Sequence, residues 1–306
     1  MQPPRVTVVL PVYNGAPFVA DAIDSVIGQH DASVELVVVD DGSTDDTPRL
    51  LERLADRAVV VRQPNRGLAA ARNAGIARAR GDYLLFLDAD DLHPPGFAAR
   101  FLAAAAAAPE ADVLHCGWRA IDFAGRPLYA QELPLALDAD PFHELAVLGS
   151  PHIGALLLRR SAGARVGPFD TGLDLQEDWD YWLRLAAAGA RFRAVPDLHL
   201  VVRRHPASMA AVAGGRLARV GLAVLERQLE RHGRCPRCAR ADLGLAQWRR
   251  VAVRSSALDL ARRLGLSGGA GRWITTMLVA FRRPRLARAA VVELAAGWRR
   301  RRTASH

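Results

Sequence analysis

An α/β fold, in which helices flank a mostly parallel sheet, is predicted by two observations on this sequence. Over the first hundred residues, short apolar runs typical of buried strands alternate with segments whose apolar residues recur at helical spacing. Two of the apolar runs end abruptly in aspartate clusters, at residues 40–41 and 88–91. Because the carboxyl ends of parallel strands share one edge of a sheet, the two clusters are expected to share one crevice.

The predicted elements follow one another in a regular order. Strands are expected at Val6–Leu10, Val34–Val39, Val59–Arg62 and Tyr83–Leu87. Helices are expected at Phe18–Gln29 and Gly67–Ala79, and a third is opened by Pro48 with Thr47 as its cap. Strands that alternate with helices favour right-handed βαβ units and therefore a parallel sheet.

Beyond residue 110 the pattern is less regular, but further elements can be predicted. Strands are expected at Val113–Ala120, Gly154–Leu158, Phe192–Val195 and Leu198–Val202. Acidic residues open a helix over Gln176–Leu185, where the helix dipole favours negative charge. Arginine-rich amphipathic helices are expected after residue 213. We therefore divide the chain into a domain at residues 1–206 and a basic α-helical region at residues 207–306.

Charge is distributed unevenly along the chain. All 41 basic residues are arginine, which excludes any mechanism that needs a lysine. Residues 207–306 carry 21 arginines against five acidic residues, so this region is strongly basic. Such a surface can meet anionic lipid or nucleic acid. No nucleic-acid recognition motif is visible, and no nucleic-acid partner is expected.

The apolar and tryptophan residues at 273–298 lie among arginines, which suits a helix on an anionic membrane surface. The alternative is that they pack onto the preceding domain and leave the arginines solvated. The chain shows no signal peptide and no apolar run near the ~20 residues that span a bilayer. We therefore expect a cytoplasmic protein, with peripheral contact at the inner face of the plasma membrane as a hypothesis.

Cysteine is scarce. Cys116 lies in a strand-like run and is expected in the core, whereas Cys235 and Cys238 form one Cys-Pro-Arg-Cys with His232 just upstream. A structural zinc site needs four ligands, usually two such pairs, so only half a site is visible. A disulfide is not expected in a reducing cytoplasm.

The apolar run at residues 83–87 ends in Asp88, Asp90 and Asp91. Carboxylates so close repel one another, which is tolerable when a hard divalent cation lies between them. Mg²⁺ and Mn²⁺ suit this role, because each is held by one or two carboxylates together with substrate phosphates. The alternative is that one aspartate caps the next helix and the others are solvated.

Five sequence blocks occur in order across residues 5–206. They are Val8–Asn14, Val38–Thr47, Asn65–Gly67 with Ala71–Gly75, Leu87–Asp91 and Glu177–Trp179. Together these blocks resemble the bacterial family 2 glycosyltransferases of the GT-A fold. Residues 207–306 lie outside the resemblance.

The resemblance implies an inverting transfer of a sugar from a nucleotide diphosphate donor, expected to be a UDP-sugar, to an acceptor hydroxyl. The acceptor is expected to be a glycan or a lipid-linked intermediate in bacterial cell-surface polysaccharide or glycolipid assembly. A divalent cation, Mn²⁺ or Mg²⁺, is the implied cofactor.

The resemblance also implies roles for individual residues. The nucleotide-sugar would be bound by Pro11, Val12, Tyr13, Asp40, Asp41, Arg72, Asp88 and Ala89. The cation would be held by Asp90 and Asp88, with His205 as a further ligand or alternatively a surface histidine. Asp178 would be the general base, with Glu177 as the second candidate. His152 and Trp179 are candidates to line the acceptor pocket.

Two other functions remain open at this stage. A nucleotidyltransferase would also cradle a nucleotide and a divalent ion, but it needs a loop rich in glycine and basic residues after the first strand. Pro11–Gly15 is not such a loop. The second alternative is a degenerate GT-A scaffold that binds without catalysis, although such proteins usually lose the acids that are present here.

Overall fold

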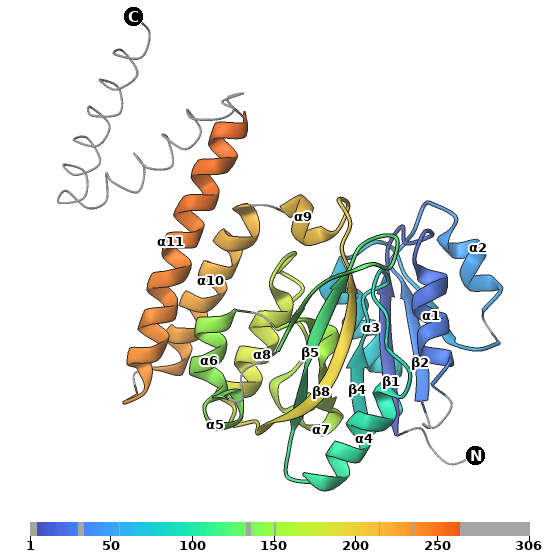
Figure 1. The fold of residues 1–306 in the computed structure, drawn as a ribbon, viewed down its shortest axis with the longest axis horizontal. Helices are drawn as coiled ribbons and strands as arrows, with labels where there is room; N and C mark the ends of the chain where they lie inside the picture. Colours follow the sequence, from blue (N-terminus) through green and yellow to red (C-terminus); the bar gives the residue numbers. More distant parts are fainter. Residues whose placement is uncertain are drawn as a thin grey trace, which may run out of the picture.

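The computed structural model describes residues 5–263 except 30–33, 55, 133–135, 150, 214 and 234 (Figure 1). Within this part of the chain, eight strands form one sheet, in the order β3-β2-β1-β4-β7-β5-β6 with β8 paired to β5. Helices cover the sheet, so the predicted mixed α/β class with a largely parallel sheet is confirmed.

The first half of the sheet is parallel, as the alternating pattern predicts. Its strands are β1 (Val6–Val12), β2 (Val34–Asp40), β3 (Val59–Arg62) and β4 (Tyr83–Phe86). β1 pairs with both β2 and β4, and all seven of its residues are buried. The carboxyl ends of β1, β2 and β4 therefore lie at one edge, directly before the aspartate clusters.

Helices of the first half pack on this parallel sheet. They are α1 (Val19–Ile27), α2 (Thr47–Glu52), α3 (Leu68–Arg78) and α4 (Phe97–Ala107). The small residues of α3 have a packing reason, because a Cβ atom at Gly75 would lie 2.4 Å from Cγ1 of Val9. α3 can therefore approach β1 closely.

The prediction that Thr47 caps α2 is wrong. Thr47 is the first residue of that helix, and Asp46 occupies the cap position. The hydroxyl of Thr47 is buried and accepts a hydrogen bond from the backbone N–H of Gly15 at 3.0 Å. It thereby ties α2 to the loop after β1 rather than closing the end of its own helix.

The second half of the sheet is mixed. It consists of β7 (Leu156–Arg159), β5 (Val113–Ile121), β6 (Pro127–Gln131) and β8 (Phe192–Arg203). β7 runs antiparallel to β4 and β5, whereas β8 runs parallel to β5. The two strands predicted at 192–195 and 198–202 are one strand whose pairing shifts register, with Asp197 at a φ of 57°.

The remaining helices are α5 (Ala136–Ala139), α6 (Pro141–Leu148), the 3₁₀ turn η1 (Ile153–Ala155), α7 (Arg160–Val166), α8 (Glu177–Ala187), α9 (Met209–Ala213), α10 (Gly215–His232) and α11 (Cys238–Arg263). Of these, α6, α8, α10 and α11 lie to the left of β5 and β8 in Figure 1. α10 contacts α8, and α11 contacts α10 and α6. Trp248 of α11 packs on Trp179 of α8, with ring centroids 4.9 Å apart.

The boundary predicted at residue 206 stays a prediction, although helices dominate after it. The segment 273–298, on which the membrane hypothesis depends, lies outside the described residues. Among the residues that are described, we find no helix of the length and apolar character needed to cross a membrane.

Candidate functional site

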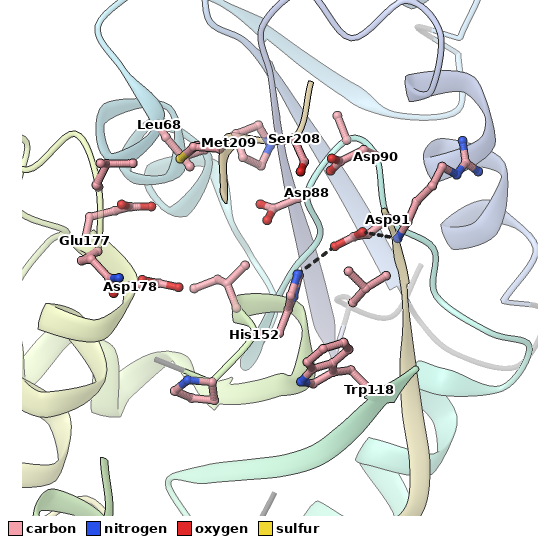
Figure 2. Close-up of a pocket in the computed structure, with 18 of the residues that line it drawn as sticks. Leu68, Asp88, Asp90, Asp91, Trp118, His152, Glu177, Asp178, Ser208 and Met209 are labelled. Atoms are coloured by element: carbon pink, nitrogen blue, oxygen red, sulfur yellow. Dashed lines mark hydrogen bonds and ion pairs between the residues drawn. The ribbon is translucent and has the colours of Figure 1, made fainter. Parts of the chain in front are cut away.

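A cavity of about 610 Å³ opens at the carboxyl ends of β1 and β4. A volume of this size is typical of small-molecule sites. The residues that line it include Pro11–Gly15, Asp88–Asp91, Gln176–Asp178 and Arg203–His205. Figure 2 shows Glu177 and Asp178 on one side of this cavity and the aspartates that follow β4 on another.

The three aspartates after β4 have different environments. The side chains of Asp88 and Asp90 are 30% and 29% exposed, so both can reach a ligand in the cavity. Asp91 is buried, and its Oδ1 accepts a hydrogen bond from the backbone N–H of Arg203 at 3.0 Å. Asp91 therefore fastens the acidic loop to the end of β8.

A second contact fixes the same loop. The backbone groups of Leu92 and Val201 exchange hydrogen bonds of 2.9 and 3.1 Å. This short antiparallel bridge joins the segment after β4 to β8. Asp88 and Asp90 are thus presented by a loop that is held at its far end.

Two histidines contact the aspartates. His152 Nε2 lies 3.1 Å from Asp91 Oδ2, and His205 Nε2 lies 2.9 Å from Asp90 Oδ2. His205 thus lies beside Asp90, and its role as a cation ligand stays a prediction. His152 was expected only to line the acceptor pocket, whereas its ring also reaches the acidic loop (Figure 2).

The donor set fits a divalent cation. Asp88, Asp91 and His152 offer ligand atoms that all lie within 4.8 Å of one another, and Asp90 with His205 is adjacent. Burial, and then the charges of Asp90 and Asp88, raise the pKa of Asp91 well above its usual range. Burial also lowers the pKa of His152, which favours the neutral imidazole that a metal requires. A cation among these groups would relieve the repulsion between the carboxylates.

Arg72 of α3 lies at the centre of the site. Its side chain is only 2% exposed, and it forms ion pairs with Glu177 and, at 2.9 Å, with Asp88. Burial alone would lower the pKa of Arg72, but the charges of Asp88 and Glu177 outweigh that effect and raise it. Arg72 is therefore a buried, charged group and not part of a solvated helix face.

The two candidate bases on α8 have different surroundings. Glu177 is buried and paired with Arg72, whereas Asp178 is half-buried and lines the cavity. One carboxylate oxygen of Asp178 accepts the backbone N–H of Trp179 at 2.7 Å. Gln176, at a φ of 61°, turns the chain into α8 directly before this pair.

The acids after β2 lie at the same sheet edge but not among the residues that line the cavity. Asp40 accepts a hydrogen bond from the N–H of Ser43 at 2.9 Å. Asp41 accepts from the N–H groups of Arg66 and Gly67, at 2.9 and 2.8 Å. Asp41 thereby organises the loop that leads into α3.

The remaining predicted nucleotide-sugar residues, Pro11, Val12, Tyr13 and Ala89, all line the cavity. Trp179 does not. It is fully buried and donates its indole N–H to the carbonyl of Leu145 at 3.1 Å, so the prediction that it lines an acceptor pocket is wrong. Its large ring fills the space between α8, α6 and α11 instead.

Arg204 and Trp118 were not predicted as site residues. The guanidinium carbon of Arg204 lies 5.1 Å from the centre of the Trp118 ring, and both residues line the cavity. Arg204 Nε is buried and has no hydrogen-bond partner within the described part of the chain. Arg203 and Arg204 directly precede His205, so the sequence offered a signal for Arg204 as a site residue. Trp118 is distant in sequence, and only the fold brings it to the cavity.

Arg72→Met tests the buried ion pairs. The substitution leaves the Glu177 carboxylate buried without its partner, and we expect it to lower the free energy of unfolding by about 3–5 kcal/mol. Adding Glu177→Gln should recover part of that loss, because the stranded charge is removed. Urea unfolding, followed by circular dichroism, measures both.

Arg49→Met is the matched control, since Arg49 forms an exposed pair with Asp46. It should change the free energy of unfolding by no more than about 0.5 kcal/mol. A loss as small as this in Arg72→Met would contradict the role given to Arg72.

Comparison with known proteins agrees with this geometry. The family model described as Glycosyl transferase family 2 matches residues 7–161. The succinoglycan biosynthesis protein ExoO of Rhizobium meliloti is 32% identical over 222 residues, 68% of this chain and 63% of that protein. An uncharacterized glycosyltransferase of Rickettsia prowazekii is 30% identical over 187 residues, 59% of this chain and 58% of that protein. The matches thus span less than two thirds of these relatives' lengths.

Solved structures share the fold. S. aureus TarS 1–349 in complex with UDP-GlcNAc superposes with a TM-score of 0.61 at 16% identity, over 96% of this chain and 92% of that one. The mannosyltransferase PcManGT from Pyrobaculum calidifontis, in complex with GDP-Man and Mn²⁺, gives a TM-score of 0.61 at 24% identity, over 96% and 87%. The fold is therefore of the GT-A type, and with a family model that covers half of its length, the chain belongs to glycosyl transferase family 2.

Proposed function

We propose that this chain is an inverting glycosyltransferase that moves a sugar from a nucleotide diphosphate to an acceptor hydroxyl. The observation that carries the proposal is a single cavity lined both by the accessible carboxylates of Asp88 and Asp90 and by Asp178. Transfer with inversion needs these two groups of residues, one near the leaving diphosphate and the other near the attacking hydroxyl.

The donor would bind along the β1 and β4 ends of the cavity. Pro11, Val12, Tyr13 and Ala89 supply the lining there. Asp40 lies at the adjacent end of β2, and its carboxylate would accept a ring N–H of uracil, thymine or guanine, whereas Asp41 would hold the loop that leads into α3. A UDP-sugar is the donor we expect; the complexes of two structural relatives contain UDP-GlcNAc in one case and GDP-Man in the other.

Asp88 and Asp90 would hold a divalent cation, with His205 and His152 beside them. Mn²⁺ or Mg²⁺, when bound, would supply positive charge next to the leaving diphosphate. Arg204 would add a guanidinium on the same side of the cavity, where a planar fork suits phosphate oxygens. Arg72 forms ion pairs with Asp88 and Glu177, so it would act mainly by holding those carboxylates in place.

Asp178 would act as the general base. The acceptor oxygen forms a bond to the anomeric carbon as its proton passes to the Asp178 carboxylate, and the bond from that carbon to the diphosphate breaks. Glu177 is less suited to this step, because its carboxylate is buried against Arg72.

The acceptor would enter where Leu148 of α6 and Trp248 of α11 line the cavity. This partly apolar and aromatic lining suits a sugar ring or a lipid-linked glycan. We expect the product to belong to cell-surface polysaccharide or glycolipid assembly. A degenerate scaffold that binds without catalysis is the alternative, and the experiments below distinguish the two.

Asp178→Asn should lower the transfer rate by at least about 10²-fold, since the base is lost. The affinity for the nucleotide should stay nearly unchanged, because Asp178 acts on the acceptor. Product formation and nucleotide titration measure the two effects separately. Asp174→Asn, at an exposed aspartate near the same helix, should keep full activity. An active Asp178→Asn enzyme would remove Asp178 from the role of base.

Thermal unfolding with UDP, TDP, GDP or CMP, each with and without Mn²⁺ or Mg²⁺, identifies the donor class. A ligand at a hundred times its Kd adds about 2.7 kcal/mol to the stability, which is readily seen as a shift in Tm. We expect one diphosphate to raise the Tm more with metal than without it. In Asp90→Asn the added metal should give no further rise in Tm. No shift with any nucleotide in folded protein would favour the degenerate scaffold.

We also propose that residues 272–306 contact an anionic membrane surface peripherally. A chain that lacks these residues should move from the membrane fraction to the soluble fraction, because the arginines there would contribute on the order of 1 kcal/mol each. An unchanged distribution between the fractions would exclude this membrane contact.

A further inference from the structure

A second cluster of metal-binding side chains lies outside the cavity, where the turn between α10 and α11 meets α6. Its members are His143 of α6, His232 at the end of α10, Cys235 in the turn and Cys238 at the start of α11. Each offers one ligand atom, and these atoms all lie within 4.8 Å of one another. Two cysteines and two histidines are the donor set of a closed zinc site.

Two distances in the cluster match those of a tetrahedral site. With Zn–S bonds of about 2.3 Å and Zn–N bonds of about 2.0–2.1 Å, the edges of a tetrahedron are about 3.8 Å between two sulfurs and about 3.6 Å between sulfur and nitrogen. Here the two sulfurs lie 3.6 Å apart, and Cys235 Sγ lies 3.4 Å from His143 Nε2. The thiols are therefore close enough to share one ion.

Neighbouring side chains hold the rings of the two histidines in fixed orientations. His143 Nδ1 lies 2.7 Å from Asp140 Oδ1, which orients the ring and leaves Nε2 directed at Cys235. A carboxylate behind a metal-bound histidine is the usual second contact in zinc sites. The ring of Phe142 stacks on His232 at 4.1 Å and fixes its plane.

The second observation is an unsatisfied nitrogen. His232 Nε2 is buried, and within the described residues it has no hydrogen-bond partner. A buried polar atom without a partner costs stability, and a metal ion would satisfy it.

In the cysteine pair, the backbone N–H of Cys235 donates a hydrogen bond to Cys238 Sγ at 3.2 Å. Both thiols are free in the structure, and no disulfide joins them. The alternative reading, a redox-active cysteine pair, gives no reason for the two histidines beside it.

We propose that this chain binds one Zn²⁺ through His143, His232, Cys235 and Cys238, as a structural ion. Four protein ligands leave no open position for a substrate, so the ion would have no catalytic part. Its effect would be to fasten the α10–α11 turn to α6. This matters for the cavity, because α6 contributes Leu145 and Leu148 to its wall and α11 contributes Trp248.

Metal content of the full-length protein tests the proposal directly. After purification without chelator, we expect close to one zinc per chain, and the double variant Cys235→Ser/Cys238→Ser should lose at least about nine tenths of it. Cys116→Ser, at a cysteine outside the cluster, should keep its zinc, and so should Asp90→Asn in the acidic loop of the cavity. These two controls separate the cluster from non-specific thiol binding and from the cavity.

Cobalt gives an independent readout of the ligands. Replacing zinc by Co²⁺ should produce the visible bands of a tetrahedral ion and a thiolate-to-cobalt charge-transfer band in the near ultraviolet. His143→Ala should weaken the visible bands while the charge-transfer band persists, because the cysteines remain. Removing zinc with a chelator should lower the Tm, and Zn²⁺ but not Mg²⁺ should restore it.

Three results would overturn the proposal. The first is folded wild-type protein that takes up no zinc even when Zn²⁺ is supplied. The second is zinc retained in full by the double cysteine variant. The third is an intact mass that shows the two cysteines oxidised to a disulfide in protein prepared under reducing conditions.

Discussion

The buried guanidinium of Arg72 is the contact on which the geometry of the cavity depends. It comes from α3, and it pairs with Asp88 after β4 and with Glu177 at the start of α8. Two consecutive elements and a helix whose Glu177 lies 105 residues after Arg72 therefore meet at one cation. Because a buried charge is tolerable only when it is paired, movement of any one element would strand a charge, and the three are held in register. The position of Asp178, one residue after Glu177, follows from this arrangement.

The three carboxylates of the acidic loop after β4 have different roles. Asp91 turns inward and accepts a backbone hydrogen bond from β8, whereas Asp88 and Asp90 remain accessible. The inward aspartate fixes the direction of the other two. β8 in turn continues into the segment that carries Arg204 and His205, so one strand both anchors the loop and delivers further polar groups to the cavity.

The other wall of the cavity is built differently, by helices that pack on one another. Trp179 fills the space between α6, α8 and α11, and Trp248 lies against it while also lining the cavity. The cluster of His143, His232, Cys235 and Cys238 lies at the end of the same helices. Metal binding there would act on the shape of the acceptor side through α6 and α11, without touching the reacting groups.

The sequence by itself determined that the first half of the sheet is parallel, where its four strands lie along the chain and that the acid clusters share an edge, because these depend on local periodicity and on where each strand ends. The tertiary structure alone decided which acids are buried. It also decided that Glu177 pairs with Arg72, that Trp179 is a core residue and that His152 reaches Asp91. His143, which lies 92 residues before Cys235, completes a cluster of which the sequence revealed only half. Contacts over such separations leave no mark on local patterns, since they arise only when the packing of whole helices brings distant side chains together.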